Sequence, residues 1–281
     1  MNTQIIIDST TDIPHSLQDK CTIVPLCVRF GYTEYLDGVT IDHKQFYEKL
    51  IESDQLPSTS QPTPDAFAQA YQKVVDAGQK AVVLTVSSEM SGTYQSATIA
   101  AMDYPGKIYV VDSRSVTIGT GILAQLAIEM AQKGAAAEEI VRHISAQREN
   151  VRLIAMLDTL EYLKKGGRIS PTVAFAGNLL AIKPVICVRD GAIVMLGKAR
   201  GSKQANNLLV EEIQKAGGVD FDKPVLLGYT GLNDTLLQKY IADSSALWAQ
   251  SKQALEYTPI GSVIGTHAGP GAVAAAFFAK N

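Results

Sequence analysis

Hydroxyl side chains gather in two short stretches of the chain that could bind an anion. The first stretch is residues 57–64 (PSTSQPTP), in which three prolines flank four hydroxyls. Proline fixes its own φ angle and drives the preceding residue toward extended backbone, so these hydroxyls lose little conformational freedom on binding. We expect Thr59 and Ser60 to bind the anion, while Thr63 is a typical N-cap before Pro64. An ordinary N-cap loop is the alternative.

The second stretch is Ser91-Gly92-Thr93, which follows an apolar run at residues 81–86 and precedes a helix expected over residues 95–102. A strand, a Ser/Gly turn and a helix start place free backbone N–H groups at the positive end of a helix dipole. The turn lacks Gly-Lys-Thr/Ser and has one glycine where a dinucleotide site needs three. It therefore predicts a binding site for an anion other than a nucleotide.

A histidine and two arginines complete the set of candidate side chains. Residues 260–272 are expected to form a strand that delivers Thr266 and His267 to a glycine-rich turn before a terminal helix. A lone histidine is often structural, but this setting between glycines favours a functional role. Arg168 and Arg200 are the candidate cations. Solvated surface charges are the alternative interpretation for both.

Catalytic patterns are poorly represented. The chain shows no conspicuous Cys-His pair, no Gly-x-Ser-x-Gly motif and no carboxylate pair in an acid/base context. Asp8 and Asp12 are four residues apart, which differs from the Asp-x-Asp motif of haloacid dehalogenases. We interpret Asp8 as orienting nearby hydroxyls and Asp12 as a cap ahead of Pro14. These patterns favour a binding protein. The alternative is a hydrolase or acyltransferase that uses Ser91 with His267.

Composition narrows the class of protein further. The 281 residues carry a net charge of −3 with a pI of about 5.8, which argues against a nucleic-acid surface. The three cysteines are odd in number and lack metal-ligand spacing, so we expect a reducing compartment, no metal site and no cofactor. A signal peptide and a membrane-spanning run are both missing. The sequence therefore predicts a cytoplasmic protein without stable membrane insertion, and leaves transient membrane contact open.

Alternating strands and helices up to residue 157 predict a doubly wound α/β domain with a mainly parallel sheet. Its expected strands are 5–7, 23–30, 81–86, 108–112 and 151–157, and an Asp42/Gln45 capping box is expected to start a helix that buries Phe46, Leu50 and Ile51. After residue 157 the pattern becomes a capping box at Asp158 and Glu161, a hairpin at 185–196, then helix, strand and helix. We predict an N-terminal domain at 1–157 and an α+β domain at 158–281, with a mainly antiparallel sheet.

Several ordered motifs together resemble the bacterial DegV family, the fatty-acid-binding subunits of fatty acid kinase. The resemblance spans essentially the whole chain. The motifs that carry it are Ile6-Ile7-Asp8-Ser9, Thr59-Ser60-Gln61-Pro62, Ser91-Gly92-Thr93-Tyr94, Val111-Asp112-Ser113, Leu163-Lys164-Lys165-Gly166-Gly167-Arg168, Lys183-Pro184, and Ile264-Gly265-Thr266-His267 with Gly269-Pro270-Gly271.

The resemblance implies a non-enzymatic carrier in which a long-chain fatty acid is buried between two α/β domains. It assigns the carboxylate to Thr59 and Ser91, and places Arg168 and His267 at the head-group opening, where a separate ATP-dependent kinase subunit would form acyl phosphate. Arg200 would help to dock that kinase. A sensor of another apolar acid would share these motifs, and the residues leave chain length and unsaturation undetermined.

Overall fold

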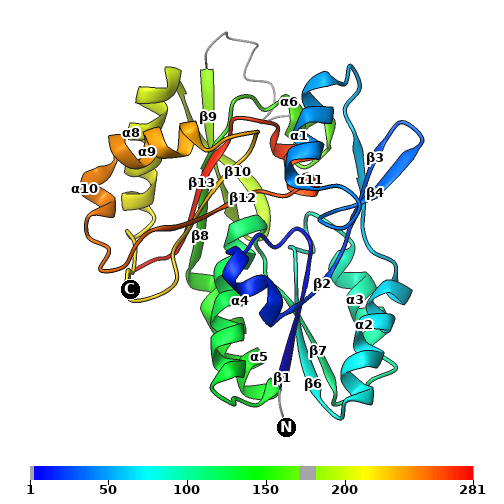
Figure 1. Ribbon diagram of the computed structural model, residues 1–281. Helices are drawn as coiled ribbons and strands as arrows, with labels where there is room; N and C mark the ends of the chain where they lie inside the picture. The colour runs from blue at the N-terminus through cyan, green and yellow to red at the C-terminus, as the bar shows by residue number, and fades with distance from the viewer. Residues whose placement is uncertain (1–2, 171–181, 281) are drawn as a thin grey trace.

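The computed structural model describes residues 3–170 and 182–280, which form two α/β domains (Figure 1). The N-terminal sheet has the order β2-β1-β6-β7, and all of its neighbouring strands are parallel. Its strands are β1 (Thr3–Asp8), β2 (Thr22–Val24), β6 (Lys80–Thr85) and β7 (Ile108–Asp112). Parallel strands covered on both faces are rich in β-branched residues, as β1 and β6 are here.

Helices cover both faces of the parallel sheet, so the expected doubly wound arrangement is confirmed. On one face, Phe67 and Tyr71 of α2 (Pro64–Asp76) pack with Val83 and with α3 (Thr93–Ala101). On the other face lie α4 (Thr117–Gln132) and α5 (Ala137–Gln147). The predicted Thr63 cap of α2 is confirmed, since the Thr63 side chain accepts a hydrogen bond from the Ala66 N–H.

The second sheet has six strands in the order β10-β9-β8-β13-β11-β12, and its neighbours are antiparallel except for β11 and β12. The strands are β8 (Val151–Met156), β9 (Ile182–Arg189), β10 (Ala192–Arg200), β11 (Leu226–Tyr229), β12 (Glu256–Pro259) and β13 (Val273–Phe278). On one face of this sheet lie α8 (Gly201–Lys215), α9 (Thr235–Asp243) and α10 (Ser245–Trp248). The expected α+β unit and its Asp190-Gly191 hairpin are confirmed.

Helix α4 joins the two domains because it packs against strands of both sheets (Figure 1). Ten of its sixteen residues are buried, including Gly119 and Gly121. A helix that is apolar on all sides is typical of an element covered from every direction. The interior of the molecule is therefore continuous from one sheet to the other.

Two expectations about strands are wrong, and one small sheet was not predicted. Strand β8 pairs antiparallel with β9 and β13, so residues 151–156 belong to the second sheet and not to the N-terminal alternation. The run 23–30 is two strands, because Pro25 removes a backbone donor between β2 and β3 (Cys27–Phe30). Strand β3 pairs with β4 (Thr33–Leu36) and β5 (Ser58–Ser60) in a third, small antiparallel sheet that the sequence did not reveal. The pairing of β8 favours a domain boundary before Val151.

The order of elements at the C-terminus is also the reverse of the prediction. Residues 262–268 form helix α11 (Ser262–Ala268), and the glycine turn after it leads into strand β13. The apolar run after Gly271 is buried at every position because β13 lies inside the six-stranded sheet. An apolar run of this length does not distinguish a buried strand from a buried helix.

The short helices show one success and two errors. The Asp42/Gln45 capping box starts α1 (His43–Glu52) as predicted, but Ile51 is 58% exposed, so its expected burial is wrong. The predicted capping box of α6 (Glu161–Lys165) is absent, because Leu160 is the N-cap and the Asp158 carboxylate pairs with Lys183. The remaining elements are the short 3-10 helices η1 (His15–Lys20) and η2 (Arg148–Asn150).

Within residues 3–170 and 182–280, no helix is long and apolar enough to cross a bilayer. The same described residues contain no group of three or more His, Cys, Asp or Glu side chains that could hold a metal ion. The three cysteines are free thiols, of which Cys187 is buried.

Candidate functional site

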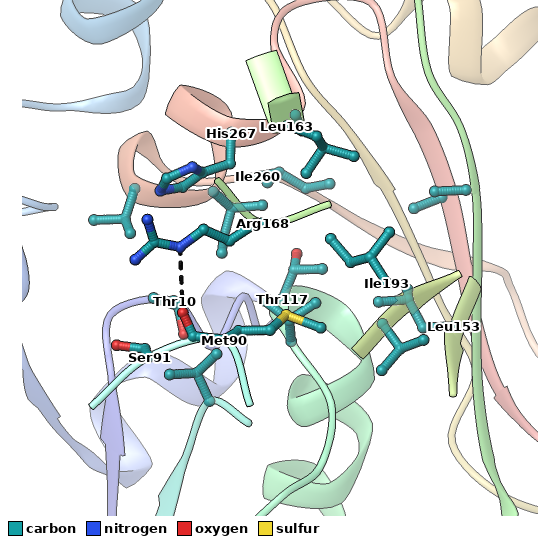
Figure 2. A pocket seen from close by; sticks show the side chains of 18 of the residues that line it. Thr10, Met90, Ser91, Thr117, Leu153, Leu163, Arg168, Ile193, Ile260 and His267 are labelled. Atoms are coloured by element: carbon teal, nitrogen blue, oxygen red, sulfur yellow. Dashed lines mark hydrogen bonds between the residues drawn. The ribbon is translucent and has the colours of Figure 1, made fainter. Parts of the chain in front are cut away.

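A cavity of about 380 Å³ lies between the two domains, and most of the predicted site residues line it. Its polar end contains Thr59, Ser60, Ser91, Arg168 and His267. Figure 2 shows Ser91, Arg168 and His267 on one side of this space and Leu153 and Ile193 on the other. The volume is within the usual range for small-molecule sites, roughly 300–1,000 Å³.

The other end of the cavity is apolar. Its walls come from α4, from strands β8 and β9, from the start of β10 and from β13. The apolar lining residues in these elements, or directly next to their ends, are Val116, Leu153, Ala155, Leu157, Ile186, Val188, Ile193, Ala272 and Ala274. A cavity with hydroxyls at one end and aliphatic side chains along the rest suits an amphiphile with one polar group.

Thr59 points inward because it is the middle residue of strand β5. Side chains alternate along a strand, so Ser58 and Ser60 are exposed while Thr59 is half-buried against β3. The prolines keep this short segment extended, but its direction is set by pairing with β3 rather than by a loop. This geometry favours Thr59 over Ser60 as the main hydroxyl donor.

His267 lies at the C-terminal end of α11, not at a helix N-terminus as the sequence suggested. Its Nε2 is 2.9 Å from Thr59 Oγ1, which joins the C-terminal segment to strand β5. When Nε2 carries the proton, the imidazole donates to Thr59, and the Thr59 hydroxyl hydrogen is free for a carboxylate. His267 thus orients Thr59.

The charge state of His267 follows from its surroundings. Burial, together with the positive charge of Arg168, lowers the pKa of His267 to about 4. The imidazole is therefore neutral at pH 7, and its Nδ1 is buried without a hydrogen-bond partner among the described residues. A neutral histidine and hydroxyls form a site whose fixed positive charge comes from Arg168 alone among the lining residues.

The Ser91 turn begins helix α3, which starts at Thr93 and not at the expected Gln95. Ser91 Oγ is 2.8 Å from Thr93 Oγ1 and accepts a hydrogen bond from the Thr93 N–H. Among the described residues, Ser91 lines the cavity whereas Gly92 and Thr93 do not. Thr93, which is fully buried, therefore holds Ser91 in place.

Gln61 is a site residue that sequence reasoning missed. Its side chain lines the cavity, and its Nε2 donates to Ser96 Oγ on α3 at 3.0 Å. A Cβ added to Gly92 would lie 2.2 Å from Gln61 Oε1, so the Gln61 side chain occupies the space that Gly92 leaves. Gln61 thereby fixes the Thr59 segment against the Ser91 turn. Its position directly after the hydroxyls of Thr59 and Ser60 could have indicated a place in the site.

Gly166 makes a similar close approach to His267. A Cβ at Gly166 would lie 2.2 Å from His267 Nδ1, although its φ of −75° suits any residue. The sequence indicated only that Gly166-Gly167 ends a helix, and Gly167 does so with φ of +68°. Gly166 is needed for packing against the imidazole.

Arg168 connects the segment after α6 to the Ser91 turn. Its Nε donates to the Met90 carbonyl at 3.3 Å (Figure 2). Its Nη1 donates to the Gly166 carbonyl at 2.6 Å. The guanidinium is exposed at the cavity edge, and its acceptor Met90 immediately precedes Ser91. Arg200, in contrast, ends β10 and does not line the cavity, so the structure separates it from the other predicted site residues.

Buried carboxylates position the elements around the cavity. Asp8 accepts hydrogen bonds from the backbone and hydroxyl of Thr10, as the sequence predicted, and also from the Val86 N–H. Asp12 accepts from Thr117 Oγ1 at 2.5 Å and from the Gly261 N–H at 2.9 Å. The predicted role of Asp12 as a local cap before Pro14 is wrong, because it anchors the start of α11. Burial raises the pKa of Asp12 to about 8.

Comparison with protein families then identifies the chain. The DegV family model, described as an uncharacterised protein of the DegV family, matches residues 2–280. The chain belongs to the DegV family. The match covers both domains, so the DegV motifs at Thr59, Ser91 and His267 meet in one fold and at one cavity.

Relatives of this DegV protein include fatty-acid-binding proteins. A fatty acid-binding protein of Thermotoga maritima is 32% identical over 97% of this chain and 96% of its own length. A fatty-acid-binding DegV family protein of Thermus thermophilus has 30% identity and a TM-score of 0.87 over 99% of this chain and 100% of its own. The Fatty Acid Kinase B3 protein of Streptococcus pneumoniae, loaded with linoleic acid, shares the fold with a TM-score of 0.86 and 24% identity over the full length of both chains.

Proposed function

We propose that this DegV protein is a carrier that buries a long-chain fatty acid in the cavity between its domains. The observation that carries the proposal is the hydrogen bond between Thr59 and His267 at the polar end of an otherwise apolar cavity. The relatives named above as fatty-acid-binding proteins support it. We further propose a cytoplasmic location and a bacterial fatty acid kinase as the partner.

The expected energetics agree with this assignment. Burying a methylene group contributes about 0.8 kcal/mol, so a long acyl chain contributes on the order of 10 kcal/mol. Moving the carboxylate out of water costs several kcal/mol, so the head group needs charge-assisted hydrogen bonds. The hydroxyls of Thr59 and Ser91 supply these bonds, and Arg168 adds positive charge at the rim.

The proposal predicts that Thr59→Ala combined with Ser91→Ala yields a folded protein that loses its fatty acid. Each hydrogen bond to a charged group contributes about 1.5–3 kcal/mol, so the affinity should fall roughly 100-fold or more. Denaturing mass spectrometry of the purified protein measures the co-purified lipid, and fluorescence titration measures the affinity. Ser58→Ala is the matched control, because Ser58 lies on the opposite face of β5. Retention of lipid by the double variant would show that the carboxylate site is wrong.

The kinase partnership makes a separate prediction for the two arginines. Because Arg168 lies at the cavity edge and Arg200 lies outside it, their substitutions should act differently. Arg168→Ala should keep the bound lipid but lower the maximal rate of acyl-phosphate formation, since it removes charge beside the reacting group. Arg200→Ala should instead raise the concentration of carrier needed for half-maximal rate.

Initial rates with the kinase subunit, ATP and each lipid-loaded variant test this assignment. Wild-type rates for both variants would contradict it.

The alternative function, an enzyme with Ser91 as nucleophile and His267 as base, has less support because His267 is hydrogen-bonded to Thr59 and Ser91 to Thr93. Turnover of acyl or phosphate esters by the isolated protein would revive that alternative.

A further inference from the structure

A second cavity, which we call the arginine groove, adjoins the apolar part of the first cavity. Its volume is about 370 Å³, and it is bounded by the loop after β7, the starts of η2 and β8, the tip of the β9–β10 hairpin and the end of α8. Leu153, Cys187 and Val188 line both cavities, so the two are separated by a single layer of side chains. Among the described residues, none of the predicted head-group residues lines the groove.

The groove has an excess of positive charge. It is lined by five basic residues and three acidic residues, which gives a difference of two positive charges: Arg114, Arg148, Arg152, Arg189 and Lys215 against Glu149, Asp190 and Glu212. All three carboxylates already have partners. Arg114 pairs with Glu149 at 3.4 Å and with Asp190 at 3.2 Å. Arg148 also pairs with Glu149, and Lys215 pairs with Glu212.

Arg152 and Arg189 carry the unbalanced charge. They lie on the neighbouring strands β8 and β9, each two residues from the last pair of that ladder, Ile154 with Cys187. Arg152 donates to the Glu149 and Val151 carbonyls, and neither arginine has an ion pair with a carboxylate within residues 3–170 and 182–280.

We propose that the arginine groove is a binding site for a soluble, phosphate-bearing small molecule, held by Arg152 and Arg189. A phosphate dianion matches the surplus of two charges, and its oxygens accept paired hydrogen bonds from planar guanidinium groups. Arg148 and Lys215 also line the groove, but glutamates already pair with both of them, so Arg152 and Arg189 are the available cations. The walls come from separate segments of both domains, which fits a small ligand inside a groove better than a flat membrane surface.

Isothermal titration calorimetry with inorganic phosphate tests the site on the full chain. We expect saturable 1:1 binding that weakens about tenfold or more when both arginines are replaced, as Arg152→Gln with Arg189→Gln, because two charge-assisted contacts are lost. Arg142→Gln, an exposed arginine of α5 outside the groove, should bind like the wild type. The melting curve of the double variant checks that it is folded.

Three outcomes would overturn the proposal. The first is an absence of saturable phosphate binding to the folded wild type. The second is a loss of phosphate affinity at a site outside the groove. Equal weakening by Arg142→Gln would assign the phosphate to general surface charge, and weakening by Arg168→Gln would assign it to the head-group site. The third is arginine-dependent binding to phosphatidylglycerol vesicles without binding of inorganic phosphate. Lipid retention by the Thr59 and Ser91 variants is measured separately, so the groove and the proposed carrier function fail or succeed independently.

Discussion

His267 is held against Thr59 and is neutral at a pH where a free histidine would be partly protonated. Its ordinary pKa is 6.5, and burial beside Arg168 lowers the pKa to about 4 in the folded protein. Between these values an unfolded chain binds a proton that the folded protein does not bind, so the free energy of unfolding should fall as the pH drops from 6.5 to 4. The slope from one group is at most about 1.4 kcal/mol per pH unit.

Urea unfolding of the wild type and of His267→Gln over this pH range isolates the contribution. The variant should lose less stability on acidification than the wild type. Asp12 acts in the opposite sense, because its raised pKa lowers stability as the pH rises from 3.8 toward 8, but it is present in both proteins and cancels in the comparison. His143→Gln is the matched control, an exposed histidine on α5. Parallel pH profiles for the wild type and His267→Gln would contradict the burial argument.

At the scale of elements, the contact between strand β5 and the start of α3 determines how far Thr59 lies from Ser91. Gly92→Ala should displace Gln61, break its hydrogen bond to Ser96 and weaken fatty-acid binding about tenfold, since a net hydrogen bond contributes roughly 1 kcal/mol and the two hydroxyls would move apart. The backbone at Gly92 has φ of −71°, so alanine adds no backbone strain. Fluorescence titration with a fatty acid measures the change.

A second substitution distinguishes steric displacement from general damage. Gln61→Ala in the Gly92→Ala background removes the overlapping side chain, so much of the lost affinity should return. If Gly92→Ala alone binds fatty acid like the wild type, Gln61 does not position the two segments. If the double variant is weaker than Gly92→Ala, the effect is not steric.

At the scale of the whole molecule, the site exists because α11 is anchored in the N-terminal domain while α11 itself leads into the central strand β13. Asp12 binds the Gly261 N–H, and Asp37 binds the Ser262 N–H, at the start of α11. The helix then carries His267 to Thr59 on the small third sheet. These three hydrogen bonds join residues that are more than 200 positions apart in the sequence, and α4 fills the space between the sheets.

The sequence by itself determined the local features of this protein. Capping at Asp42 and Thr63, the hairpin at Asp190-Gly191 and the parallel strands 81–86 and 108–112 follow from turn chemistry and apolar periodicity, which act over a few residues. The hydroxyls of Thr59 and Ser91 were found in the same way. These patterns were sufficient for the two-domain α/β class and for two hydroxyls that line one cavity.

Only the tertiary structure decided which elements meet. Strand β8 is apolar on both faces, and that pattern suits either sheet, so its place beside β13 depends on packing with residues that lie far along the chain. The same holds for α11 and β13, whose order a short apolar run cannot reveal. Gln61, Gly166 and Arg152 acquired their roles through close contacts or charge surplus created by the fold, because such effects depend on distances in space rather than on spacing in the sequence.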